Sequence, residues 1–201
     1  MRIDPNSRNI QGITSFLTFV ALNVLYLLTC LPVVTIGVAT SALYEVTIRY
    51  SDDERGRPLK DYLLALRANV RRATLVYLAL VVPAGVLLFS GVFWLSSGSS
   101  IGAAAATIAF LASAYLLAAF LFGMALVAQF DTGVRRTVRN ALLLPAAEPV
   151  RTFGIVLIPV TVVAVTIVFP TFLVVLVTVA FSVGAYASAF LFRGVFARHA
   201  G

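Results

Sequence analysis

The residues with the greatest capacity for chemistry lie in one arginine-rich segment, residues 131–145. Arginines alternate there with apolar residues at helical spacing, which predicts an amphipathic helix. Asp131 or Thr132 can cap this helix, and Pro145 and Pro149 are expected to end it. Such a helix lies along lipid headgroups or docks against a partner. The candidate docking residues are Asp131, Arg135, Arg136, Arg139 and Pro145.

A second basic amphipathic helix is predicted to begin at Pro58 and to continue directly into an apolar stretch at Ala73. Its apolar stripe follows the helical repeat and consists of Leu59, Tyr62, Leu63, Leu66 and Val70. Its basic residues are Lys60, Arg67, Arg71 and Arg72. Packing on the membrane surface and docking to a partner are both open to this helix.

The sequence offers little for catalysis or for a cofactor. His199 is the only histidine and Cys30 the only cysteine, so neither a metal site nor a nucleophile–histidine pair is expected. No phosphate-binding loop with a following lysine occurs. The polar residues inside apolar stretches are expected to form helix–helix hydrogen bonds, and they are Asn23, Ser113, Thr161, Thr166 and Ser182. We therefore expect no enzyme, no cofactor and no metal.

The basic helices are connected by long apolar stretches, which must position them. The mean hydropathy is +1.01 and 61% of the residues are hydrophobic, far above a soluble domain. Stretches of the length that crosses a bilayer predict five spans, at about residues 12–34, 73–96, 101–130, 150–169 and 171–192. The expected fold is a single all-α domain over residues 1–201. It is a polytopic membrane bundle of about five transmembrane helices plus two cytoplasmic amphipathic helices.

The distribution of charge predicts the orientation. Arginines gather between spans 1 and 2, between spans 3 and 4, and after span 5, whereas residues 97–100 and 169–171 carry no charge. The positive-inside rule therefore places the C-terminus and both basic helices in the cytoplasm of a bacterium, and the N-terminus outside. An N-terminus inside would require residues 38–50 to form a re-entrant half-helix. Because the net charge of +7 lies beside spans, lipid and not nucleic acid is its expected partner.

Span 1 is expected to break at a turn held by Pro32 and Gly37. A helix over residues 38–50 should follow, with Glu45 and Arg49 as an ion pair one turn apart. Small residues recur every fourth position on spans 3 and 5, which permits close helix packing within one chain or self-association into a homo-oligomer. These residues are Ala105, Ala109, Ser113, Ala180, Gly184 and Ser188.

Several of these segments together resemble the YesL-like family of bacterial membrane proteins, a domain of unknown function. The resemblance rests on LPVVTIG at 31–37, ATSALY at 39–44, RAN at 67–69, Asp131 and RNALL at 139–143. Members of that family are typically encoded near sugar-uptake ABC transporters. The resemblance therefore implies an accessory or scaffold role in carbohydrate uptake and names no reaction.

The segment from Asp131 to Leu144 and Pro145 also resembles the coupling loop of ABC importer permeases, in which an acid, a glycine and a Leu-Pro pair frame a short helix. Gly133 is displaced by one position, and LVA at 126–128 replaces the upstream acid-Ala-Ala. The alternative function is accordingly a small permease-like subunit that couples to a cytoplasmic ATPase. In either case the expected partners are sugar ABC transporter subunits on the cytoplasmic side.

Overall fold

The computed structural model describes residues 8–52 and 57–199, and within them it contains helices and no strand. The long helices are α1 (Arg8–Cys30), α2 (Ile36–Asp52), α3 (Pro58–Leu95), α4 (Ser100–Gln129), α5 (Val134–Ala147), α6 (Pro149–Val168) and α8 (Phe181–His199). Short elements complete them: η1 (Val33–Thr35), η2 (Pro170–Phe172), α7 (Leu173–Val175) and the π-helical turn η3 (Leu176–Ala180). The chain is an all-α helical bundle, as predicted.

Four helical stretches are long and apolar enough to cross a membrane. They are α3, α4, α6 and the stretch Pro170–Arg198, which joins α7 and α8. The described apolar part of α1, Thr14–Cys30, is shorter. The chain is therefore built as a multi-pass membrane protein, while the count of five spans and their orientation stay predictions.

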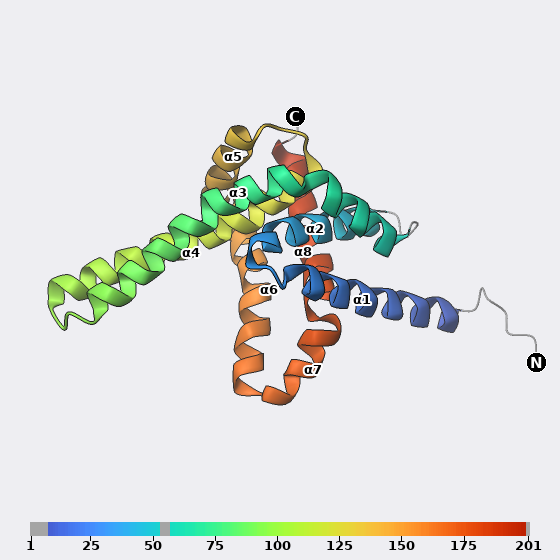
Figure 1. The fold of residues 1–201 in the computed structure, drawn as a ribbon, viewed down its shortest axis with the longest axis horizontal. Helices are drawn as coiled ribbons and strands as arrows, with labels where there is room; N and C mark the ends of the chain where they lie inside the picture. Colours follow the sequence, from blue (N-terminus) through green and yellow to red (C-terminus); the bar gives the residue numbers. More distant parts are fainter. Residues whose placement is uncertain (1–7, 53–56, 200–201) are drawn as a thin grey trace, which may run out of the picture.

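Helix α2 lies at the centre, and the other helices radiate from it (Figure 1). Eleven of its seventeen residues are buried, and it packs against α1, α3, α4 and α8. The hairpin of α3 and α4 extends to one side in this view, and the hairpin of α6 and α8 extends downwards. The greater part of each hairpin is uncharged, because no Asp, Glu, Lys or Arg occurs in residues 73–130 or 152–192.

The predicted break between α1 and α2 is confirmed at Pro32, which follows the end of α1, but the role predicted for Gly37 is wrong. Gly37 lies inside α2 and not in the turn. A Cβ placed on Gly37 would stand 2.4 Å from Tyr77 Cβ and 3.2 Å from the Ala73 carbonyl oxygen. Gly37 therefore permits close contact between α2 and α3. Among the described residues, Gly98 alone has a positive φ, and it follows the end of α3.

Helix α3 is one continuous helix of 38 residues, so the basic amphipathic helix does continue into the apolar stretch. Only part of its predicted apolar stripe packs inside the bundle. Tyr62 is buried, whereas Leu59, Leu63 and Val70 are exposed. The buried row instead combines Tyr62 with Ala65 and Ala73. Small side chains allow close helix contact, and exposed leucines are compatible with lipid.

Three of the polar span residues form helix–helix hydrogen bonds, as predicted. The fully buried Asn23 donates to the carbonyls of Leu176 (3.1 Å) and Val177 (2.7 Å) and accepts from the amides of Phe181 (2.9 Å) and Ser182 (3.0 Å). Its carboxamide thus lies within the backbone ladder of η3, where a π-helical turn interrupts the α-helix.

The other polar span residues divide into two groups. Ser182 donates to the Phe19 carbonyl at 2.9 Å, and Ser113 donates to the Ala84 carbonyl at 2.9 Å, so each joins two helices. Thr166 bonds a carbonyl of its own helix, and Thr161 is exposed on α6. The small residues Ala109, Ala180 and Ser188 are buried inside the chain, so they pack helices of the same molecule.

Candidate docking site on the basic face

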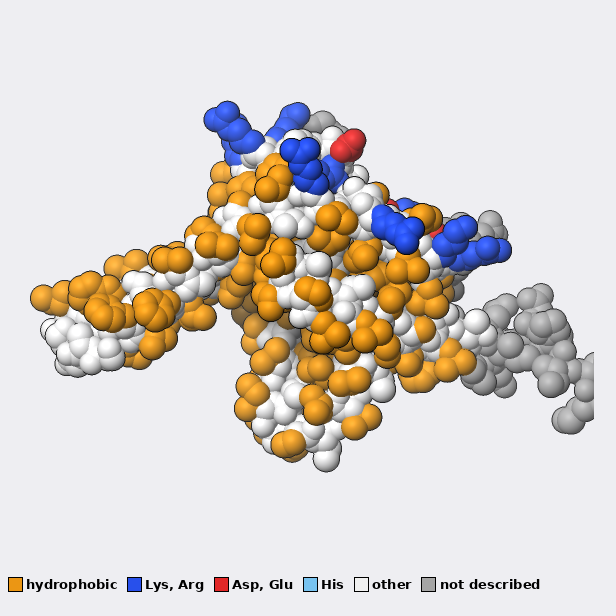
Figure 2. All heavy atoms as spheres, viewed as in Figure 1, with side chains coloured by type: hydrophobic (Ala, Val, Ile, Leu, Met, Phe, Trp, Pro, Cys, Tyr) orange, Lys and Arg blue, Asp and Glu red, His pale blue; other side chains and the backbone are white. Residues whose placement is uncertain are grey.

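Basic side chains gather along one edge of the molecule, above the two hairpins (Figure 2). We call this surface the basic face. Its exposed members are Lys60, Arg67 and Arg71 on α3, and Arg135, Arg136 and Arg139 on α5. Helix α5 and the middle of α3 adjoin there, because Arg71, Arg72, Asp131 and Val134 line one shared hollow. The two basic helices predicted from the sequence therefore adjoin at this hollow.

The inner side of α5 is fixed to the bundle. Thr137 and Ala141 are fully buried, and the Tyr115 hydroxyl of α4 donates to the carbonyl of Leu142. The hydroxyls of Thr132 and Thr137 lie 2.9 Å apart and tie the start of α5 to its second turn. The outer side chains of α5 are thus presented by a helix that is already ordered.

The predicted caps of α5 and its predicted end at Pro145 are wrong, whereas the predicted end before Pro149 is confirmed. The helix begins at Val134 with Gly133 as its N-cap, and no side chain caps it. Pro145 is buried inside the helix, which ends at Ala147. The carbonyls at the end of the helix nevertheless have donors. The Glu148 amide bonds the Leu144 carbonyl at 3.0 Å, and the Thr152 hydroxyl bonds the Pro145 carbonyl at 3.2 Å.

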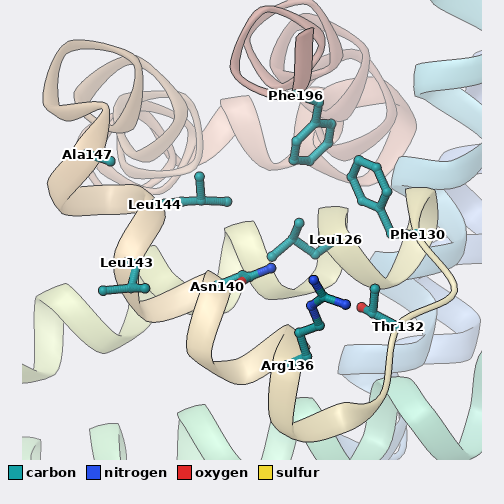
Figure 3. Close-up of a pocket in the computed structure, with 9 residues that line it drawn as sticks. All are labelled: Leu126, Phe130, Thr132, Arg136, Asn140, Leu143, Leu144, Ala147 and Phe196. Atoms are coloured by element: carbon teal, nitrogen blue, oxygen red, sulfur yellow. The ribbon is translucent and has the colours of Figure 1, made fainter. Parts of the chain in front are cut away.

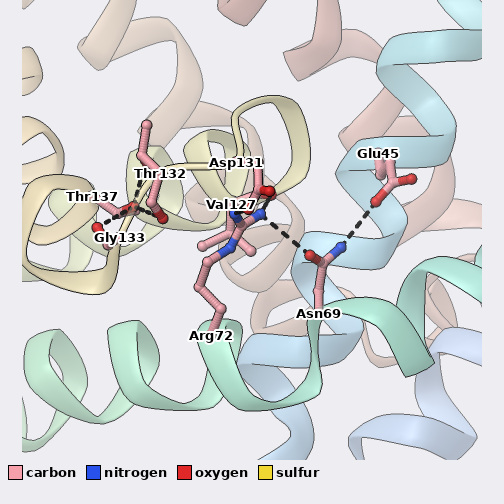
Figure 4. Close-up of polar contacts among 8 residues, drawn as sticks. All are labelled: Glu45, Asn69, Arg72, Val127, Asp131, Thr132, Gly133 and Thr137. Atoms are coloured by element: carbon pink, nitrogen blue, oxygen red, sulfur yellow. Dashed lines mark hydrogen bonds and ion pairs between the residues drawn. The ribbon is translucent and has the colours of Figure 1, made fainter.

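A chain of polar contacts joins α2, α3 and the connection between α4 and α5 (Figure 4). Arg72 ion-pairs with Asp131 at 2.6 Å and also donates to the Val127 carbonyl and to Asn69 Oδ1, the latter at 3.3 Å. Asn69 Nδ2 in turn donates to Glu45 Oε2 at 3.0 Å. The predicted ion pair of Glu45 with Arg49 is present at 3.0 Å. Arg72 and Asp131 therefore bind each other and position the start of α5.

The arginines of α5 form two rows. With about 100° between successive residues, Arg135 and Arg139 share one side of the helix, and Arg136 and Asn140 share the next. No hydrogen bond or ion pair joins any of these four side chains to another residue in the described part of the chain. We call Arg135 and Arg139 the outer row. The outer row has the exposed, unpaired charge that an acidic partner would neutralise.

The second row lines a cavity of about 470 Å³ between α5 and the C-terminal ends of α4 and α8 (Figure 3). The side chains of Arg136 and Asn140 point into it, and so does the Thr132 hydroxyl. The rest of the lining is apolar and includes Phe130 and Phe196. Sequence reasoning missed Asn140 and this cavity, although the spacing of four residues from Arg136 to Asn140 was a visible signal.

Of the residues predicted for docking, Arg135 and Arg139 lie together on the outer row, and Arg136 faces the cavity. Asp131 is paired with Arg72, and Pro145 is buried. On α3, Lys60, Arg67 and Arg71 are exposed, whereas the side chain of Arg72 is only 19% exposed. Arg72 is therefore a structural residue of the basic face and not part of its free surface.

Comparison with known proteins finds one family. Residues 19–92 match the model of a family described as Protein of unknown function, DUF624. No curated protein and no solved structure matches the chain. The matched segment runs from α1 through the break at Pro32 and all of α2 to the last turns of α3, and it includes Glu45, Asn69 and Arg72. Residues 19–92 are therefore similar to an uncharacterised family over the part of the chain that contains the central helix α2.

Proposed function

We propose that this protein is a non-enzymatic accessory or scaffold protein of the bacterial cytoplasmic membrane. In this proposal it is associated with carbohydrate uptake and uses the outer row of α5 to hold a cytoplasmic subunit of a sugar importer. The observation that carries the proposal is the pair of exposed, unpaired arginines, Arg135 and Arg139, on a helix whose inner side is fixed. The YesL-like resemblance supplies the link to carbohydrate uptake.

The physical case rests on preorganisation and charge. Binding to a helix that is already ordered costs no conformational entropy for ordering that helix. More of the favourable contact energy therefore appears as binding free energy. Two guanidinium groups one turn apart can each bind a carboxylate in bidentate geometry. An acidic surface on the partner would therefore meet complementary charge at a fixed spacing. The basic face is expected in the cytoplasm, where such a subunit is located.

A transport pathway through the bundle has less support. Such a pathway needs polar side chains that are free to bind a solute near the midplane. Asn23 and Ser182 are instead engaged with backbone groups of the bundle, and so is Ser113. An inner cavity of about 210 Å³ has the hydroxyls of Tyr26 and Thr40 in its lining, but these bond each other at 3.3 Å.

The proposal is tested by charge reversal on matched pairs. Full-length protein carrying Arg135→Glu and Arg139→Glu is purified in mild detergent from cells that also produce a sugar-importer permease and its ATPase. The control carries Lys60→Glu and Arg67→Glu, the same change of charge on the α3 part of the basic face. Recovery of the ATPase should fall about tenfold or more for the α5 pair and little for the control pair. Equal recovery from all three proteins, or an equal fall for both pairs, would contradict docking at the outer row.

A further inference from the structure

The cavity beside α5 combines two unpaired polar side chains with an apolar wall. The side chains of Arg136 and Asn140 point into it from successive turns, and neither side chain bonds another described residue (Figure 3). A guanidinium group and a carboxamide together offer several N–H donors and only one acceptor oxygen. The Thr132 hydroxyl, already bonded to Thr137, can add a further bond. The polar part of the cavity is therefore suited to an anionic group rich in acceptor oxygens.

The apolar wall is fixed by aromatic contacts. Phe130 and Phe196 meet edge to face with ring centroids 5.3 Å apart, and Phe196 stacks on Phe192 at 6.0 Å. Leu126 and Leu144 contribute buried apolar surface to the same wall. Because these side chains are held by one another, the cavity does not depend on a ligand to keep its shape. Its volume of about 470 Å³ lies within the range of small-molecule sites.

Polarity changes along α5 inside the cavity. The lining residues near the start of the helix are polar, namely Thr132, Arg136 and Asn140, whereas those near its end are Leu143, Leu144 and Ala147. The apolar end adjoins the connection to α6, where Arg151 ion-pairs with Glu148, and the uncharged stretch of α6 begins one residue later, at Thr152. The lining of the cavity therefore changes from polar to apolar along α5, and its ligand should have the same gradient.

We propose that this cavity binds one anionic phospholipid. Its phosphate lies on Arg136 and Asn140, and the first part of an acyl chain lies against Phe130, Phe196 and Leu144. A bilayer supplies such a molecule at the level where basic side chains meet hydrocarbon, and basic pockets between membrane helices are suited to lipid headgroups. The site does not rest on docking at the outer row, because Arg135 and Arg139 lie outside the cavity.

The test measures retained lipid. Full-length protein is purified in neutral detergent, incubated with phosphatidylglycerol or phosphatidylcholine, and examined by native mass spectrometry. Wild-type protein should keep one phosphatidylglycerol in preference to phosphatidylcholine. Arg136→Gln should weaken this retention about tenfold, since a charge-assisted bond is lost. Arg135→Gln combined with Arg139→Gln removes twice the charge but should change retention less than about twofold, because exposed charges attract lipid weakly.

Two further arms separate the lipid from other ligands and from misfolding. Ala147→Trp fills the apolar end of the cavity without altering charge and should also release phosphatidylglycerol, while the elution volume of the protein stays unchanged. Inorganic phosphate and glycerol phosphate in excess should not displace the lipid, because they lack the chain. Displacement by either, or retention that depends on Arg135 and Arg139 and not on Arg136, would overturn the proposal.

Discussion

Arg72 Nη1 donates to Asp131 Oδ1 across 2.6 Å and so joins the middle of α3 to the connection between α4 and α5. Arg72 also donates to the Val127 carbonyl, which lies in the last turn of α4 and has no amide of its own helix to accept from. One partly buried guanidinium group thus caps the end of α4 and fixes the point from which α5 begins. The position of the outer row depends on this contact.

The two partners should contribute unequally. Asp131 is fully exposed, so water screens its ion pair with Arg72 and the pair alone contributes little to stability. Arg72 also bonds backbone and Asn69, so its loss leaves several groups without a donor. We expect Arg72→Gln to accelerate amide hydrogen exchange over residues 131–138 strongly, and Asp131→Asn to do so slightly. Equal acceleration by both variants would show that the exposed ion pair alone holds α5.

The contact of Gly37 with Tyr77 predicts a steep dependence on side-chain size. A Cβ at Gly37 would overlap Tyr77 Cβ and approach the Ala73 backbone, so α2 and α3 must move apart. Gly37→Ala should destabilise the protein by about 1–3 kcal/mol, and Gly37→Val by more. Gly85→Ala is the matched control, since a Cβ there meets no atom within 4 Å. Thermal unfolding in detergent measures both, and equal melting temperatures for Gly37→Ala and Gly85→Ala would refute the close contact.

Much of the helical fold follows from the sequence, but the buried faces do not. The positions of the helices could be predicted from the apolar stretches, from Pro32 and from the charged segments. These signals are local, because each acts on the residues beside it in the sequence. The buried side of α3 could not be identified from apolar residues, because residues that face lipid are as apolar as those that face other helices. Phe89 is 75% exposed, whereas Ala65 and Ala106 are buried. The helix faces that pack against other helices carry small residues, whereas large apolar residues lie on the exposed faces.

Asn23 should be the most sensitive polar residue of the bundle. It satisfies four backbone groups at η3, so Asn23→Ala would leave two carbonyls and two amides without that partner. We expect a loss of about 1–3 kcal/mol, seen as a lower melting temperature. Thr166→Ala is the control, because Thr166 bonds only a carbonyl of its own helix, and it should change little. A melting temperature for Asn23→Ala equal to that of Thr166→Ala would mean that the π-helical turn does not need the carboxamide.

The candidate site was predictable in composition and not in geometry. The arginines of residues 131–145 and their helical spacing were plain from the sequence. The division into an outer row and a cavity row depends on which side of α5 meets α4, and the Tyr115 bond to Leu142 decides that. The pairing of Arg72 with Asp131 joins residues 59 positions apart, and a single sequence carries no signal for such a contact.

The orientation of the basic face is testable by labelling. In a Cys30→Ser background, Ser96→Cys at the end of the α3–α4 hairpin should react with an impermeant thiol reagent in intact cells. Lys60→Cys on the basic face should react only after the membrane is permeabilised. The same distribution of charge also places Asp53 inside, at a position outside the described residues. Labelling of position 60 in intact cells would show that the orientation is the opposite of the predicted one. It would also contradict docking in the cytoplasm.

The most direct measurement of the central claim is site-specific photocrosslinking from the outer row. A benzophenone amino acid replaces Arg139 in one protein and the exposed Phe89 of the α3–α4 hairpin in another, and each is irradiated in cells that produce the sugar importer. We predict a crosslink from position 139 to the ATPase that Arg135→Glu abolishes, and none from position 89. A protein that crosslinks to lipid alone at position 139, or equally to the ATPase from both positions, would contradict the account.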